Sequence, residues 1–192
     1  MPDPRHEVLD FLLTRRSRPA KTLTMPVPDR AALMPMLQAA ARTPDHGKLE
    51  PWRFIVIEKP ACARLAELTA TRGAAMGHGG ERIAKAVSQF GDAGLVVAVV
   101  AAPVASEKVP EVEQLLSVGA VCLALLNAAL ASGWGANWLS GWMATDRDFL
   151  RDGLGLAAHE FVAGYIHIGS ETSAPPERPR PDLAAKTSWL AE

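Results

Sequence analysis

The chain has 192 residues, of which 48% are hydrophobic, and 20 basic against 21 acidic side chains give a formal net charge of −1. This length and apolar content suffice for a substantial core, so we expect a single domain over residues 1–192. Charges of both signs are scattered, with no basic block and no acidic tail. This pattern argues against nucleic acid and anionic membranes as partners.

The cysteines and the N-terminus favour a cytoplasmic protein. Cys62 and Cys122 are far apart, form no CxxC motif and have Ala-rich and Leu-rich neighbours. Buried free thiols in a reducing compartment are therefore favoured over a disulfide. The polar stretch 1–7 contains no apolar segment typical of a secretory signal.

The N-terminal region predicts two helices. Apolar residues recur at helical spacing over 5–16, which predicts an amphipathic helix that ends at paired arginines. Asp29 is a candidate N-cap for a second helix that runs towards Arg42. Pro35 should kink this helix or make it start later, because proline lacks a backbone donor and clashes with the preceding turn.

The middle of the chain alternates between strands and helices. β-Branched and aromatic residues predict a strand over 54–58, and an early proline favours a helix over 60–71. A small, flexible segment at 73–80 precedes a short helix at 82–90. The run at 94–101 is apolar at every position, which is typical of an interior strand.

A long apolar segment at 115–132 has about the length that a membrane-spanning helix needs. It is rich in Ala, contains Ser, Gly and Asn, follows two glutamates and has no flanking basic cluster. These features favour a buried helix of a compact domain, apolar all round, within a predicted helix over 110–132.

The C-terminal third predicts two more strands and one helix. The strands cover 136–139 and 161–168, and a helix capped by Thr145 or Asp146 lies between them. The Pro-rich end, within about 171–192, should be extended. Helices that flank a few well-separated strands predict an α+β fold rather than a regular βαβ array.

Three short segments could bind a cofactor. Arg15, Arg16 and Ser17 combine two guanidinium forks with a hydroxyl, a set that suits a phosphate, although basic residues also end ordinary helices. Arg42 and His46 lie in the Pro-bounded stretch RTPDHGKLEPW and could supply polar contacts, although a loop histidine often only bonds backbone.

The third segment is Trp138-Leu139-Ser140-Gly141. An indole and a hydroxyl suit a flat cofactor ring, since they offer packing and a hydrogen-bond donor. Trp134 and Trp142 complete a four-residue spacing that would form one stripe on a helix, but the nearby glycines disfavour a helix here.

These segments resemble the nitroreductase family, and in particular its small YdjA-like members. The resemblance covers nearly the whole chain, from the RRS segment through RTPDH and WLSG to His167-Ile168-Gly169-Ser170. It implies a nitroreductase-like fold with a central mixed, mainly antiparallel sheet flanked by helices, in a two-fold homodimer that binds FMN at the subunit interface.

The resemblance also assigns roles to residues. It implies that Arg15 and Ser17 hold the FMN phosphate and that Arg16 faces the ribityl chain or the pyrimidine. Arg42 and His46 would contact FMN, His46 across the dimer interface. Trp138, Leu139 and Ser140 would lie at the flavin. Relatives often have Arg at position 139, so Leu139 retains only its backbone contacts; Arg178 or Arg180 could compensate.

The implied activity is electron transfer from NADH or NADPH to a nitroaromatic, quinone or similar acceptor by ping-pong hydride transfer. The flavin N5 carries the chemistry, so no catalytic side chain is expected. Two alternatives stay open, namely other flavin chemistry on the same fold and a non-catalytic module that stores or senses FMN. The sequence shows no dinucleotide fingerprint, no P-loop and no GxSxG motif of a hydrolase. Its histidines have no zinc-ligand spacing, so no metal is expected.

Overall fold

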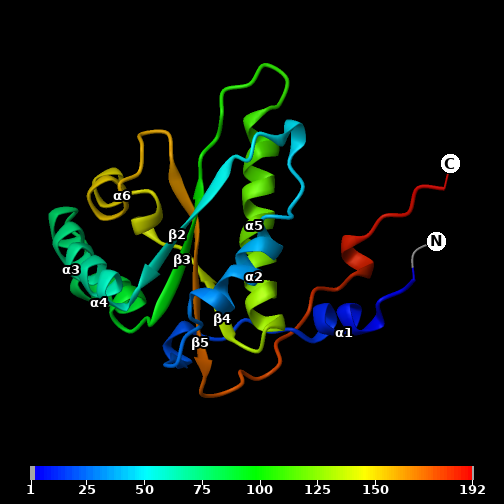
Figure 1. Ribbon diagram of the computed structural model, residues 1–192, viewed down its shortest axis with the longest axis horizontal. Coiled ribbons are helices and arrows are strands. Elements are labelled where there is room, and N and C mark those ends of the chain that lie inside the picture. Colours follow the sequence, from blue (N-terminus) through cyan, green and yellow to red (C-terminus); the bar gives the residue numbers. More distant parts are fainter. Residues whose placement is uncertain (1–2, 192) are drawn as a thin grey trace.

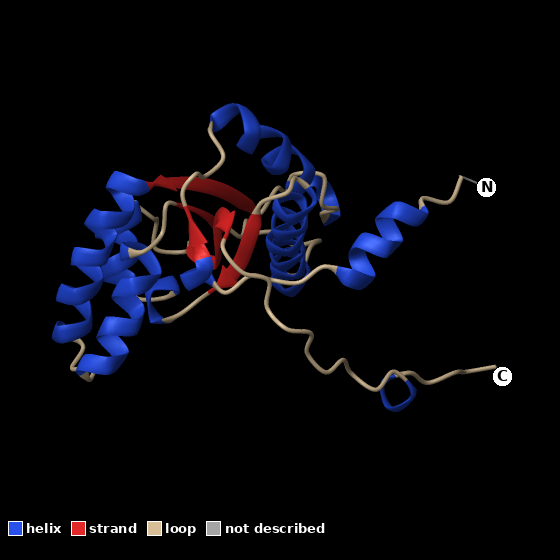
Figure 2. Cartoon of the chain, turned by 90° about the horizontal axis from the view of Figure 1, so that it is seen from below, coloured by secondary structure: helices blue, strands red, loops and turns tan. Residues whose placement is uncertain are grey.

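The computed structural model describes residues 3–191 and places a five-stranded sheet between two groups of helices (Figure 1 and Figure 2). The helices are α1 His6–Thr14, α2 Arg30–Ala40, α3 Lys59–Ala75, α4 Gly80–Gly91, α5 Glu111–Ala131 and α6 Arg147–Leu154. The strands are β1 Leu23–Thr24, β2 Trp52–Glu58, β3 Leu95–Ala101, β4 Gly135–Leu139 and β5 Phe161–Glu171. Short 3-10 helices cover Ala20–Thr22, His46–Lys48, Trp142–Ala144 and Ala184–Lys186.

The sheet has β5 near its centre. The order is β1-β5-β3-β2. Strand β4 also pairs with β5, on the edge opposite β3. The four pairings in the described chain are antiparallel. The α+β architecture predicted from the sequence is therefore confirmed, and β3 is buried at each of its seven positions, as an interior strand should be.

Two apolar cores form on opposite faces of the sheet. Alternate β3 side chains point to opposite faces, so Val97 and Val99 pack with α2 and α5, whereas Val96 and Ala98 pack with α3, α4 and α6. The two helix groups on either side of the strands are visible in Figure 2. Burial of both faces explains the continuous apolar sequence of β3.

The long apolar helix α5 meets the length and composition of a membrane span, and 44% of that window is buried in the fold. It packs against the sheet and α2 through residues such as Val121 and Leu125. Its other side leaves Val112 61%, Leu116 70% and Leu123 45% exposed. The prediction of a helix buried all round was wrong, because α5 lies in an outer layer and only one of its faces can meet the sheet.

Most predicted elements are present, with shifted ends. Asp29 caps α2 as predicted, its Oδ1 accepting the backbone N–H of Ala32 at 2.8 Å. The helix starts at Arg30 with Pro35 inside it, so a later start was wrong. Asp146, not Thr145, caps α6.

The predicted flexible segment 73–80 was partly wrong. Gly73 is buried within α3, which continues to Ala75. A Cβ atom at Gly73 would lie 2.9 Å from Ile83 Cγ1, so glycine is needed there for the close packing of α3 on α4. The two-residue strand β1 was not predicted.

Both ends of the described chain extend away from the domain (Figure 1 and Figure 2). Helix α1 has no buried residue, and its apolar stripe includes Leu9 and Leu13 at 55% and 68% exposure. The C-terminal segment is extended, as predicted, apart from the turn at Ala184–Lys186. It leaves Trp189 91% exposed.

Candidate functional site

The segment that follows α1 is fixed along the outer edge of β4. The backbone N–H of Arg18 donates to the carbonyl of Ala136 at 2.8 Å, and Asn137 Nδ2 donates to the carbonyl of Arg18. Arg15 is the C-cap of α1 with φ −57° and ψ 143°, and the last turn of the helix contains no basic residue. The arginines therefore lie beyond the helix, against the sheet, rather than in a solvated last turn.

Four arginines gather beside this edge. Arg15, Arg16 and Arg18 line a cavity of 290 Å³ with Trp134 and Glu171, and Arg180 approaches from the C-terminal segment. Burial, followed by the charges of Arg180, Arg16 and Arg18, lowers the pKa of Arg15 below its ordinary value. Uncompensated positive charge thus accumulates at Arg15.

Several groups around Arg15 suit an anion. Its Nη2 donates to Ser17 Oγ at 2.9 Å, which places the guanidinium and the hydroxyl together as predicted. Its Nε is buried and has no hydrogen-bond partner within residues 3–191. A buried unpaired donor is costly, and a phosphate oxygen would satisfy it. The residues present therefore fit a phosphate group.

Two carboxylates partly neutralise the other arginines. Glu171 pairs with Arg18, and Glu177 Oε1 lies 2.7 Å from Arg180 Nη2 and 3.4 Å from Arg16 Nη1. Arg16 Nη1 also donates to the carbonyl of Pro176 at 2.6 Å. These contacts attach the segment around Glu177 to the arginine cluster.

The second predicted pair lies elsewhere. His46 is in the 3-10 helix after α2, and its Nδ1 lies 2.7 Å from Glu113 Oε2 at the start of α5. Its side chain is 60% exposed. Ser117 Oγ donates to the carbonyl of Pro44 at 2.9 Å, so this loop is attached to the N-terminal half of α5. Arg42 is exposed just beyond α2.

Within one chain, the arginine cluster and His46 lie far apart. His46 contacts Glu113 near the start of α5, whereas Leu130, near its end, lines the arginine cavity. The 17 helical steps from Glu113 to Leu130 correspond to about 25 Å at 1.5 Å per residue. A single FMN therefore cannot contact both groups within one subunit.

The third predicted group ends β4. Trp138 lies across Gly164, where a Cβ atom would be 2.3 Å from the indole Nε1, and that Nε1 donates to the carbonyl of Ala163 at 3.3 Å. Trp138 is opposite Ile166 in the α2 and α5 core. Leu139 is opposite Tyr165 in the α3, α4 and α6 core. Trp138 and Leu139 therefore point to opposite faces of the sheet.

Two polar residues that sequence reasoning did not select lie next to Leu139. Gln89 and His167 line a cavity of 250 Å³ with it. Burial lowers the pKa of His167 to about 4, so its ring is neutral at physiological pH. The one signal in the sequence is a histidine at a core-facing position of an otherwise apolar strand.

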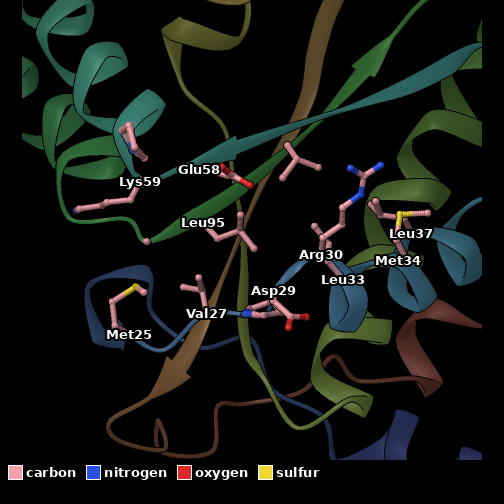
Figure 3. Close-up of a pocket in the computed structure, with 14 residues that line it drawn as sticks. Met25, Val27, Asp29, Arg30, Leu33, Met34, Leu37, Glu58, Lys59 and Leu95 are labelled. Atoms are coloured by element: carbon pink, nitrogen blue, oxygen red, sulfur yellow. The ribbon is translucent and has the colours of Figure 1, made fainter.

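A larger cavity, of 620 Å³, lies elsewhere (Figure 3). Apolar side chains from the segment before α2, from α2 and from β3 line it, with Asp29, Arg30, Glu58 and Lys59 among the lining residues. It contains no residue that the sequence selected for the cofactor. Within residues 3–191 no group of three side chains is arranged to hold a metal ion.

Comparison with known proteins identifies the family. The family model described as "Nitroreductase family" matches residues 12–170. The chain belongs to the nitroreductase family. A curated relative from Escherichia coli strain K12, "Putative NAD(P)H nitroreductase YdjA", is 32% identical over 182 residues, which cover 95% of this chain and 92% of that protein.

Solved structures show the nitroreductase fold. The nitroreductase-like family protein from Bacillus cereus superposes with a TM-score of 0.80 at 19% identity, covering 100% of both chains. The FMN-dependent nitroreductase from Clostridium difficile R20291 has a TM-score of 0.68 at 19% identity and covers 96% of this chain and 99% of that one. The fold and family predicted from the sequence are thus confirmed.

Proposed function

We propose that this nitroreductase is an FMN-dependent oxidoreductase that passes electrons from NAD(P)H to a nitroaromatic, quinone or similar acceptor. The observation that carries the proposal is the arginine cluster at β4, with the buried, unpartnered Nε of Arg15. The names of the E. coli relative and of the C. difficile neighbour support the donor and the cofactor. Two free, buried cysteines fit a cytoplasmic location.

The residues at β4 would hold the two ends of FMN differently. The guanidinium groups of Arg15 and Arg16 and the hydroxyl of Ser17 would bind the phosphate through charge-assisted hydrogen bonds. Trp138, Ser140 and the backbone of Leu139 would lie at the ring. Because the Trp138 indole packs against Gly164 and its Nε1 donates to the Ala163 carbonyl, it would offer a rigid apolar surface.

Bound FMN would supply the redox chemistry, taking a hydride from NAD(P)H and passing electrons on to the acceptor. The chain's own task is to bind and orient the cofactor and to leave one side of it open. Donor and acceptor would then occupy the same space in turn, which is the basis for a ping-pong scheme.

The site is complete only in a homodimer. A two-fold axis near the middle of α5 would pair two such helices antiparallel, through an exposed face that includes Leu116 and Leu123. That arrangement would bring the partner's His46 towards this subunit's arginine cluster, across the 25 Å (about 17 residues of helix) that separates them within one chain. Arg42 would approach in the same way.

The purified protein tests this function. It should be yellow and release FMN, not FAD, on denaturation. Initial-rate plots with NADH or NADPH and a quinone should give parallel double-reciprocal lines, because one pocket serves donor and acceptor in turn. Colourless protein that FMN does not reconstitute would contradict the proposal, and intersecting lines would exclude the alternation of substrates.

A further inference from the structure

The first turns of α5 hold the loop that carries His46. Glu113 Oε2 lies 2.7 Å from His46 Nδ1, and one turn later Ser117 Oγ donates to the carbonyl of Pro44 at 2.9 Å. Gly47, with a φ of 77°, turns the chain directly after His46. The loop is therefore attached to one helix at two points, of which one is the imidazole itself.

A buried glutamine of the same helix supports the loop from a second segment. Gln114 is only 3% exposed, and its amide accepts from the backbone N–H of Val104 at 2.8 Å and donates to the Val104 carbonyl at 2.9 Å. It also donates to the carbonyl of Val109 at 3.4 Å. A Cβ atom at Gly47 would lie 3.3 Å from Val109 Cγ2, so this segment packs on the loop. The loop backbone thus has its own supports, and the carboxylate contact serves the imidazole alone.

The carboxylate of Glu113 decides which nitrogen His46 presents to its surroundings. A carboxylate can only accept, so Nδ1 carries the proton of this bond and the neutral ring has an acceptor at Nε2. Nε2 makes no hydrogen bond within residues 3–191, and the side chain is 60% exposed in the single chain. Hydroxyl donors line the ribityl chain of FMN. An outward-facing acceptor at Nε2 matches them.

We propose that Glu113 is a positioning residue for the FMN bound by the other subunit, and that it acts through His46. The inference rests on the proposed function. Glu113 fixes the imidazole before the cofactor arrives, so binding does not have to order this side chain, and affinity rises accordingly. Each flavin site then depends on the first turn of α5 in the partner, through a residue that does not itself touch the cofactor.

Flavin titrations of the apoprotein test the positioning role. Glu113→Leu should weaken the binding of FMN and riboflavin equally, by about five- to tenfold, the scale of one hydrogen bond. Glu113→Gln keeps an acceptor oxygen and should bind both flavins within about twofold of the wild type. In a His46→Leu background, Glu113→Leu should have no further effect, because it acts through that ring.

Glu111→Leu is the matched control. Glu111 is the other carboxylate in the first turn of α5, it is exposed, and it forms no ion pair within the described residues, so its replacement should leave flavin binding unchanged. Equal losses for Glu111→Leu and Glu113→Leu, or a further loss in the His46→Leu background, would overturn the positioning role. A loss for FMN without one for riboflavin would place His46 at the phosphate and overturn the hydroxyl contact.

A mixed dimer tests whether the effect crosses the interface. One chain carries Arg15→Ala and the other Glu113→Leu, each with its own affinity tag, and dimers that contain both chains are isolated. If Glu113 serves the partner's site, both defects fall in one site, and half of the sites bind FMN with wild-type affinity. Two weakened sites and no intact one would overturn the proposal. A wild type that does not bind FMN at all would instead overturn the proposed function.

Discussion

The carboxylate of Glu177 lies 2.7 Å from the guanidinium of Arg180, in a chain segment that also contacts Arg16. The Glu177 side chain is 65% exposed, and bonding to the Arg178 backbone N–H, aided by Arg180 and Arg16, lowers its pKa, so it is ionised at neutral pH. An anionic side chain thus occupies the arginine cluster that we assign to the FMN phosphate.

Replacing Glu177 with Gln should tighten FMN binding, because a competing anion is removed. The expected gain is about two- to fivefold, since exposed ion pairs contribute little individually. Titration of apoprotein with FMN measures it, and riboflavin, which has no phosphate, should show no gain. An equal gain for both flavins would mean that Glu177 does not compete with the phosphate.

Arg15→Ala should weaken FMN binding by roughly ten- to a hundredfold, because a charge-assisted hydrogen bond contributes about 1.5–3 kcal/mol. Riboflavin binding should change much less. Arg5→Ala is the matched control, because Arg5 is exposed at the other end of α1. If Arg15→Ala bound FMN as tightly as the wild type, or lost both flavins equally while folded, the phosphate would be bound elsewhere.

Leu116→Arg should dissociate the proposed dimer, because a charge would enter a face of α5 where Leu116 is 70% exposed in the single chain. Light scattering should show a dimer for the wild type and a monomer with weakened FMN binding for the variant. Val104→Arg, at an exposed apolar residue outside α5, is the control. A wild-type monomer saturated with FMN would contradict an interface site.

Arg53→Leu should destabilise the fold in a pH-dependent way. Arg53 Nε and Nη2 donate to the two Glu160 oxygens at 2.7 and 2.9 Å, and these bonds hold the pKa of Glu160 down at about 2. Because the pKa of Glu160 is lower in the folded state, ionised Glu160 stabilises the fold at pH values above its unfolded pKa, near 4.5. This stabilisation is lost as the pH falls towards 2.

The cost of Arg53→Leu should therefore be about 1–3 kcal/mol at pH 7 and shrink towards pH 2. Urea unfolding across this range measures it at one protein concentration. Arg151→Leu, which breaks exposed ion pairs, should change the stability much less than Arg53→Leu at pH 7. A cost for Arg53→Leu that does not change with pH would argue against the pairing.

Local patterns in the sequence sufficed for most of the fold. The uniformly apolar stretch of β3 and the Asp29 and Asp146 caps carry their signal within a few residues. The strand β1 was missed because two residues carry no periodicity. The extent of α3 was missed because Gly73 is selected by its contact with Ile83 on the next helix, which is tertiary information.

The candidate site, too, could be predicted only in part from the sequence. Motif resemblance selected Arg15, Ser17 and His46 and implied that His46 acts across a dimer interface, but it gave no distance between these groups along α5 within one chain. Distances across the fold depend on packing, which local spacing does not encode. Gln89 was not selected because its neighbours give it no motif, and only the packing of α4 beside β4 and β5 brings it to His167.

Anaerobic stopped-flow mixing of the FMN-loaded protein with NADH or NADPH tests the central claim most directly. Our account predicts rapid bleaching of the visible absorbance of the oxidised flavin and its return when a quinone or nitroaromatic is added. A module that only stores FMN would not be reduced quickly. Flavin that stays oxidised with both donors, in a folded and fully loaded protein, would contradict the assignment as an NAD(P)H-dependent oxidoreductase.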